Sequence, residues 1–227
     1  MTSRHLARHT TGSLGAATLI ALALIGVGPG RAAAASIALD VTGGGNAGTV
    51  CNPQVNPGCI VGWAFEVNSA IDVFSLGFFD VNSDGLTSSH DVGLFNSSGT
   101  LLASATVTNA STPVASASSA GRWLMANIAP IRLDPGTYTI GAFVLNQSPD
   151  SFLSSAPEVT IPTITYLGGR AEFSVASLVF PTSGPFQGFE PGLFGPTFTA
   201  QNVPEPATLV LLASGLVLAA RGIRRLG

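Results

Sequence analysis

The sequence contains no lysine, and its nine basic residues are all arginines. Six of them lie near the two ends of the chain, at positions 4, 8, 31, 221, 224 and 225. The region between, residues 36–202, keeps three arginines against eleven acidic residues, which gives it a net charge of −8. A region this acidic has no basic surface with which to neutralise phosphates, so the charge excludes binding to nucleic acid.

Residues that favour helices are also scarce, and no long stretch repeats apolar residues at the helical spacing. Short runs alternate between apolar and polar residues instead, separated by turns rich in Gly, Pro, Asn and Ser. The expected strands are 62–67, 72–79, 91–95, 101–108, 123–128, 137–145, 159–166 and 172–180. Four of them have clear inward sets: Trp63, Phe65 and Val67; Phe74, Leu76 and Phe78; Leu101, Ala103, Ala105 and Val107; Tyr138, Ile140, Ala142 and Val144. We therefore expect an all-β fold, a single antiparallel β-sandwich of jelly-roll type.

The first 35 residues have the three parts of a secretory signal peptide. Arg4 and Arg8 precede an apolar run over 14–27, and the alanines at 32–35 offer a small-residue cleavage site. A retained N-terminal helix is the alternative, but the run is short and ends in the helix-breaking sequence Gly-Pro-Gly at 28–30. The pattern predicts an exported protein whose signal helix is removed.

The last 25 residues combine a short polar motif, an apolar run over 207–220 and a basic end. The motif is Val203, Pro204, Glu205 and Pro206, and the basic residues are Arg221, Arg224 and Arg225. As a helix the apolar run would be about 21 Å long, short for a bilayer core of about 30 Å. It predicts a short transmembrane helix with its arginines on the cytoplasmic side. A buried C-terminal helix of the domain is the alternative, against which the all-round apolarity and the basic end both argue.

This order of parts resembles the PEP-CTERM sorting signal of bacterial envelope and exopolysaccharide-associated proteins, whose Pro-Glu-Pro an exosortase recognises before processing the tail. The resemblance implies the exosortase and the export machinery as partners. It also implies transit through the inner membrane of a Gram-negative-type bacterium, followed by delivery to the cell surface or extracellular matrix.

The domain organisation follows from these end segments. We expect a signal peptide at 1–35, a β-sandwich domain at 36–180, a Pro/Gly/Phe-rich linker at 181–202 and the sorting and anchor segment at 203–227. The phenylalanines of the linker allow an alternative interpretation, in which this stretch forms a last strand or packs on the domain. A Ser/Ala/Thr-rich stretch at 109–121 is expected to be a mobile connection.

Cys51 and Cys59 are the only cysteines. In an exported chain, an even pair that closes a short loop rich in Pro, Asn and Gly is most simply a disulfide. A redox site would more often have the spacing C-x-x-C, and the ligands of a zinc site are lacking nearby.

A candidate calcium loop follows the expected strand 72–79. Asp80, Asn82 and Asp84 alternate before Gly85, and Asp91 stands at the twelfth position, where an EF-hand has glutamate. Because the flanks are predicted strands, we expect no EF-hand; the remaining alternatives are a calcium-binding loop between strands and a simple Asp/Asn/Gly turn.

Part of the region resembles an extracellular β-sandwich module of bacterial surface proteins, similar in style to DUF4082-like domains. The resemblance is carried by residues 62–65, 76–80, 84–86, 89–95 and 99–103. It implies no enzymatic activity.

Candidate ligand-binding and catalytic residues are few. His90 is the only histidine outside the signal peptide, and we expect it to be structural, hydrogen-bonded to the 80–84 turn. Trp123 is the aromatic residue with which a sugar ring would stack, since Trp63 and Tyr138 belong to inward sets. No Ser-His-Asp arrangement or pair of carboxylates has a recognisable context.

The sequence therefore predicts a non-enzymatic protein of the envelope or extracellular matrix, sorted through its C-terminal tail. The alternative is a carbohydrate-binding module, with or without calcium, that attaches to exopolysaccharide. A secreted hydrolase is the third and weakest hypothesis.

Overall fold

The computed structural model describes residues 34–48, 57–146, 148–184 and 192–203. The expected signal helix, Cys51, the Pro-Glu-Pro motif and the expected transmembrane helix lie outside these residues. The described residues form 15 strands. These are β1 (Ser36–Ile37), β2 (Leu39–Val41), β3 (Asn46–Gly48), β4 (Gly58–Val67), β5 (Ile71–Val81), β6 (His90–Asn96), β7 (Leu101–Val107), β8 (Thr112–Ala115), β9 (Gly121–Leu133), β10 (Gly136–Leu145), β11 (Phe152–Ser154), β12 (Glu158–Thr160), β13 (Ile164–Phe173), β14 (Leu193–Phe194) and β15 (Pro196–Asn202). None of the described residues form a helix that could cross a membrane.

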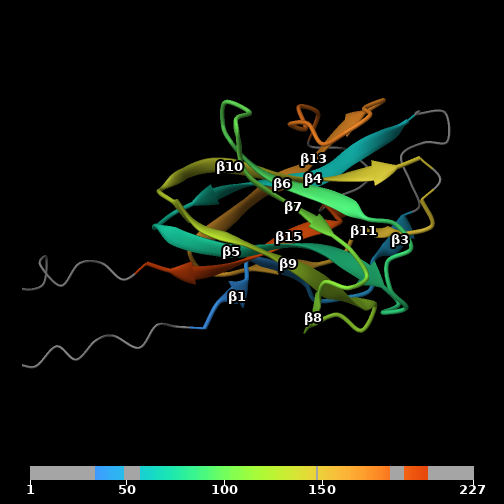
Figure 1. The fold of residues 1–227 in the computed structure, drawn as a ribbon. Helices are drawn as coiled ribbons and strands as arrows, with labels where there is room; N and C mark the ends of the chain where they lie inside the picture. The colour runs from blue at the N-terminus through green and yellow to red at the C-terminus, as the bar shows by residue number, and fades with distance from the viewer. Residues whose placement is uncertain (1–33, 49–56, 147, 185–191, 204–227) are drawn as a thin grey trace, which may run out of the picture. The chain divides into compact units, whose positions relative to one another are not determined.

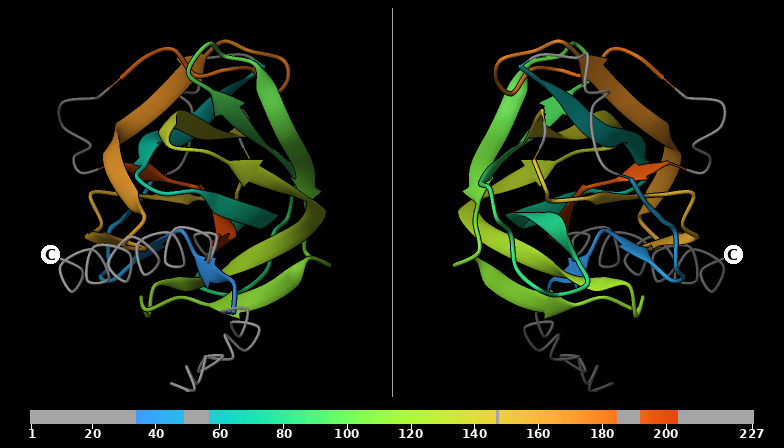
Figure 2. Two further views of the ribbon diagram at one scale, coloured as in Figure 1. Left: turned by 90° about the vertical axis from the view of Figure 1, so that its left-hand side faces the viewer. Right: turned by 90° about the vertical axis from the view of Figure 1, so that its right-hand side faces the viewer.

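Two five-stranded antiparallel sheets make up most of the domain (Figure 1). The first has the order β1-β15-β5-β9-β8 and the second has the order β13-β4-β10-β6-β7. Two small sheets, β14-β11-β3 and β12-β2, flank them. Figure 2 views the domain from both ends, along the strands. The expected all-β class is confirmed and the arrangement is sandwich-like, whereas the jelly-roll type stays a prediction.

The core lies between the two large sheets and is rich in aromatic side chains. Trp63 of β4 stacks on Phe198 of β15, with ring centres 5.9 Å apart. Its indole N–H donates to the carbonyl of Pro196 at 2.8 Å, so the polar atom of a fully buried side chain is satisfied. The inward sets predicted for β4 and β10 are confirmed, since their members belong to the core or pack against it.

Strand β15 corrects the predicted linker at 181–202. It pairs with β1 on one side and with β5 on the other, as the second strand of the first sheet. Its Phe198 is fully buried, as is Phe194 of β14. The alternation of Pro196, Phe198 and Ala200 toward the core explains why this Phe-rich stretch is a strand. The sandwich therefore extends to residue 202 rather than ending at residue 180.

Irregularities in two strands correct two of the predicted inward sets. The pairing of β5 shifts between Val73 and Ser75, which leaves Phe74 in a bulge and only partly buried. Beyond the bulge, Leu76 and Phe78 face the core. Strand β7 lies at the edge of its sheet, and its pairing with β6 shifts near Leu101. The side chain of Leu101 is 46% exposed rather than buried.

A crossover segment, residues 174–183, takes the place of the strand predicted at 172–180, because β13 already ends at Phe173. It lies against the outer face of the second sheet, where Gly62, Gly141 and Gly93 sit side by side on β4, β10 and β6. A Cβ at Gly93 would come within 2.7 Å of Leu178, and one at Gly141 within 3.4 Å of Pro181. Gly93 and Gly141 thus make room for the crossover segment.

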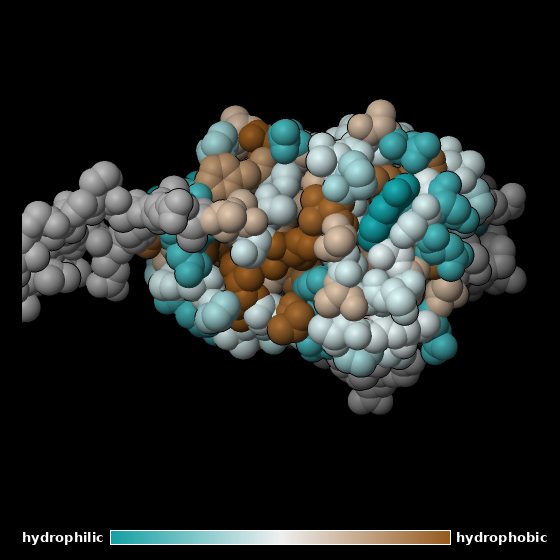
Figure 3. Space-filling view, turned by 90° about the horizontal axis from the view of Figure 1, so that it is seen from below, coloured by the Kyte–Doolittle hydropathy of each residue, from teal (hydrophilic) through white to brown (hydrophobic). Residues whose placement is uncertain are grey.

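Smaller differences concern the remaining predicted elements. The stretch 109–121, expected to be a mobile connection, contains β8, which pairs with β9. The predicted strand 159–166 is interrupted and divides between β12 and β13. Seen from below (Figure 3), hydrophobic residues form a band across the middle of the described surface, bordered by more hydrophilic ones.

Candidate functional site

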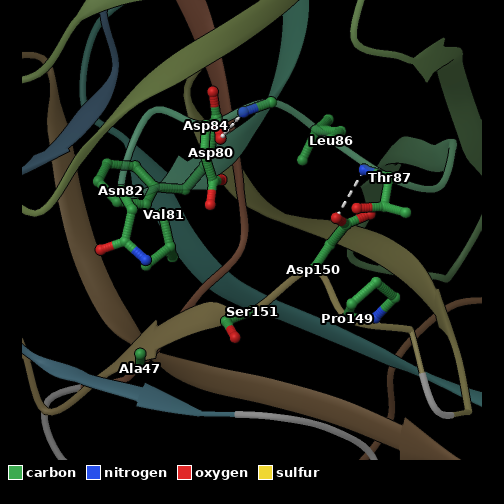
Figure 4. A pocket seen from close by; sticks show the side chains of 12 residues that line it. Ala47, Asp80, Val81, Asn82, Asp84, Leu86, Thr87, Pro149, Asp150 and Ser151 are labelled. Atoms are coloured by element: carbon green, nitrogen blue, oxygen red, sulfur yellow. Dashed lines mark hydrogen bonds between the residues drawn. The ribbon is translucent and has the colours of Figure 1, made fainter.

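A polar cavity of about 270 Å³ opens at one end of the sandwich (Figure 4). Its walls come from the end of β5, the loop 82–89 that follows it, the segment 149–151 after β10, and Ala47 of β3. This is the end at which β5 finishes, whereas β15 finishes at the opposite end, where Asn202 pairs with Ile71. We call the two ends tail-distal and tail-proximal.

Asp80 organises the first wall of the cavity. Its carboxylate is almost fully buried and accepts a hydrogen bond from Arg122 Nε at 2.8 Å. The other oxygen accepts the backbone N–H of Gly85 at 3.0 Å. Asn82, Ser83 and Gly85 all have positive φ, a conformation that Asn and Gly adopt more readily than other residues. The string of Asp, Asn and Gly thus forms a tight turn held by its own first carboxylate.

Asp150 and His90 form the second polar centre. Asp150 accepts the backbone N–H groups of Thr87 and Ser88, each at 2.7 Å. Its Oδ2 also lies 3.1 Å from Nε2 of His90, which is fully buried. The His90 ring stacks on Phe78, with centres 3.9 Å apart. The partner of the histidine is therefore Asp150 rather than the expected 80–84 turn.

The partners of His90 restrict where the proton between it and Asp150 lies. Nδ1 faces the carbonyl oxygen of Phe143 at 3.2 Å, an atom that only accepts, so Nδ1 carries a proton. Burial alone would raise the pKa of the Asp150 carboxyl, but the N–H groups of Thr87 and Ser88 and the His90 ring outweigh burial and lower it. The ionised form of Asp150 is therefore favoured, with the Thr87 and Ser88 N–H groups and the His90 ring as its partners.

The structure brings three of the four predicted calcium ligands together and places the fourth elsewhere. Asp80 and Asp84 line the cavity with Asn82, but Asp91 lies on β6 beside a different surface hollow, where it accepts the hydroxyl of Thr106 at 2.7 Å. Arg122 already neutralises the carboxylate of Asp80. In the described part of the chain, no three His, Cys, Asp or Glu side chains are grouped as a metal site requires. The turn, the alternative to the calcium loop, fits this geometry.

Trp123 does not offer a stacking surface for a sugar ring. It is fully buried, and its ring lies edge-on to Phe79. Its indole N–H donates to Asp40 Oδ1 at 2.7 Å, which also accepts the hydroxyl of Ser116 at 2.6 Å. The second oxygen of Asp40 accepts the N–H of Ala117 at 2.8 Å. Asp40, on β2, therefore links this strand by hydrogen bonds to β9 and to the turn between β8 and β9.

The sequence analysis missed Asp40, Asp150 and Arg122. Each of these residues lies more than 40 positions from the partner that defines its role. No spacing rule for nearby residues could have found these pairs.

Of the two cysteines, Cys59 is fully buried in β4 and is not a free thiol. Cys51 lies outside the described residues, so the Cys51–Cys59 disulfide stays a prediction.

Comparison with known families identifies the segment that follows β15. A family model described as the PEP-CTERM protein-sorting motif matches residues 202–225. The chain carries a PEP-CTERM sorting motif. This motif is the recognition signal for exosortase processing, and it implies export and sorting to the cell envelope or surface. No curated protein and no solved structure matches the chain. The resemblance of residues 62–103 to a DUF4082-like module stays a prediction.

Proposed function

We propose that the chain is a non-enzymatic protein of the cell envelope or extracellular matrix, which its PEP-CTERM tail holds at the inner membrane during transit. The proposal rests on one observation: the last strand of the sandwich runs directly into the sorting motif. Strand β15 ends at Asn202, and the sorting motif begins at that residue. One sandwich is thus joined directly to the segment that directs its delivery.

The surroundings of His90 support the absence of an enzymatic role. It is the only histidine outside the predicted signal peptide, and none of its side chain is exposed. Both ring nitrogens face partners within the fold, Phe143 and Asp150. A general base must reach the substrate or a water molecule, so this histidine is unsuited to activating a nucleophile.

Replacing Pro204, Glu205 and Pro206 together by alanine is expected to stop delivery without unfolding the sandwich. The substitutions follow the last described residue, so the β-sheet pairings remain. The wild-type chain is expected in the surface or matrix fraction, and the variant with the inner membrane, as measured by fractionation and immunoblotting. The same distribution for both proteins would contradict the proposal. A matched substitution of Ser119 by alanine, in an exposed turn before β9, should leave delivery unchanged.

The tail-distal cavity favours a second function, binding of exopolysaccharide. Asn82 and Asp84 are exposed at its rim, and Thr87 and Ser151 add polar groups. Carboxylates, amides and hydroxyls are the groups that hydrogen-bond sugar hydroxyls, and a cavity of about 270 Å³ is near the lower size of small-molecule sites. A polar open cavity is thus suited to one or two sugar units of a longer chain.

A double variant, Asn82→Ala with Asp84→Ala, tests this second function. Loss of hydrogen bonds to a charged group amounts to about 1.5–3 kcal/mol, so we expect binding to the producing cell's exopolysaccharide to weaken about tenfold or more. Isothermal titration calorimetry measures the affinity. Asp91→Ala, an acidic residue of the other hollow, is the control and should bind as the wild type does. Equal affinity for wild type and double variant would exclude the cavity.

A further inference from the structure

We infer that, before its tail is processed, the sandwich stands on the lipid headgroup surface by its tail-proximal end and turns the polar cavity away from the membrane. The inference rests on the proposed function, in which the tail spans the membrane during transit. It concerns the orientation of the domain and the surface that contacts lipid, neither of which the sorting motif specifies.

The fold holds the chain up to the last residue before the motif. The backbone N–H of Val203 donates to the carbonyl of Ala70 at 3.0 Å, in the turn between β4 and β5. Asn202 pairs with Ile71 and accepts the hydroxyl of Thr163 at 3.1 Å. The fixed body of the protein therefore extends to Val203, and no long flexible linker precedes the motif.

The distance from this body to the bilayer follows from chain length. The apolar run begins at Ala207, four residues after Val203. An extended chain spans at most about 3.5 Å per residue, so Val203 lies within about 14 Å of the start of the run. The polar headgroup layer on each side of a bilayer is about 5–7 Å thick. An apolar run shorter than the bilayer core draws its flanks inward. The tail-proximal end is thereby held at the headgroups.

The turns at the tail-proximal end form the contact surface. They comprise residues 68–70 between β4 and β5, residues 134–135 between β9 and β10, and residues 161–163 before β13. A hydrogen bond joins the first turn to the third, because Asn68 N–H donates to the Thr163 carbonyl at 2.8 Å. The surface is thus a set of short turns, two of which are held together directly.

Fluorescence quenching by labelled lipid tests the orientation. A fluorophore is attached to the full chain through Ser69→Cys at the tail-proximal end or Ser89→Cys at the tail-distal end, both exposed positions. The proteins are reconstituted in phosphatidylethanolamine and phosphatidylglycerol vesicles that contain a headgroup-linked quencher. Strand β5 alone spans about 35 Å, so quenching at position 69 should exceed that at position 89 by about threefold or more. Equal quenching would overturn the inference.

Two further measurements separate this inference from the proposed function. If the chain does not float with the vesicles, the proposal that the tail spans the membrane is wrong, and the inferred orientation is wrong as well. If the chain floats but position 69 is not quenched more than position 89, only the orientation is wrong. A flexible Gly/Ser segment of about 12 residues, inserted between Val203 and Pro204, spans roughly 20 Å on average. It should abolish the difference while flotation persists. If the difference in quenching persists after the insertion, the short connection between Val203 and the apolar run is not its cause, and the inference is wrong.

Discussion

A fragment that ends at residue 192 is expected to remain unfolded, whereas a fragment of residues 36–203 is expected to fold cooperatively. The shorter fragment lacks β15, so β1 loses its only described strand partner and β5 loses one of two. Trp63 loses both its stacking partner Phe198 and its acceptor at Pro196. Losing one buried Phe side chain costs about 3–5 kcal/mol, and the total stability of a domain is about 5–15 kcal/mol. Near-ultraviolet circular dichroism and thermal melting measure the difference.

The single substitution Phe198→Ala in the 36–203 fragment is the matched control. It removes one aromatic side chain but keeps the strand, so we expect a folded protein that is less stable by about 3–5 kcal/mol. Gln201→Ala, on the same strand but only partly buried, should change stability by less than about 1 kcal/mol. If the fragment ending at residue 192 melts with the same transition as the longer one, β15 is not part of the core.

The second large effect is expected for Asp150→Ala. The substitution leaves the buried imidazole of His90 without its carboxylate partner and removes the acceptor of two backbone N–H groups. Leaving buried hydrogen-bonding groups without partners costs about 1–3 kcal/mol each, so we expect a total loss of about 3 kcal/mol or more. For a domain of this size, such a loss lowers the melting temperature by roughly 10 °C. Asp91→Ala, next to His90 in sequence but exposed, should stay within about 0.5 kcal/mol of the wild type.

Two measurements show whether the His90–Asp150 pair is the cause. The pKa of Asp150 is lowered in the folded state, so its contribution to stability is present above the ordinary carboxyl pKa of about 4. It is lost as the pH falls toward the lowered value, and Asp150→Asn should flatten this part of the pH profile. The double variant His90→Phe with Asp150→Ala should be less destabilised than the sum of its single variants. Additive effects would mean that the two residues act independently.

The sequence was sufficient to predict those parts of the fold in which local pattern and burial agree. In β4 and β10, alternate residues such as Phe65 and Ile140 face the core as expected. The apolar–polar alternation gave a wrong prediction where a bulge changes which residues face the core, as at Phe74. It was also insufficient where a third layer of chain covers the outer face of a sheet. The crossover segment buries outward residues of β4 and β6, among them Ile60 and Phe95, so these strands are apolar on both faces. Nothing in the sequence of the crossover segment indicates which face it covers.

The candidate site was only partly predictable for a related reason. The turn at Asp80–Gly85 was visible because its residues are adjacent in sequence and form bonds to their own backbone. Its second wall depends on Asp150, which lies 60 residues from His90 and has no motif around it. Such a pair forms only when β6 and the end of β10 come together in the sheet. The sequence therefore indicated only the first wall of the cavity, and calcium binding there stays a prediction.

The position of β15 also determines when the sandwich can be completed. The strand is the last part of the fold to be synthesised, and its partner β1 is the first, with Ser36 opposite Ala200. Until β15 arrives, β5 presents a free edge of the kind that pairs with strands of other chains. Pairings between distant parts of a chain form slowly. Closure of the domain therefore requires strands from both ends of the described chain, and the strand that closes it leads directly into the sorting motif.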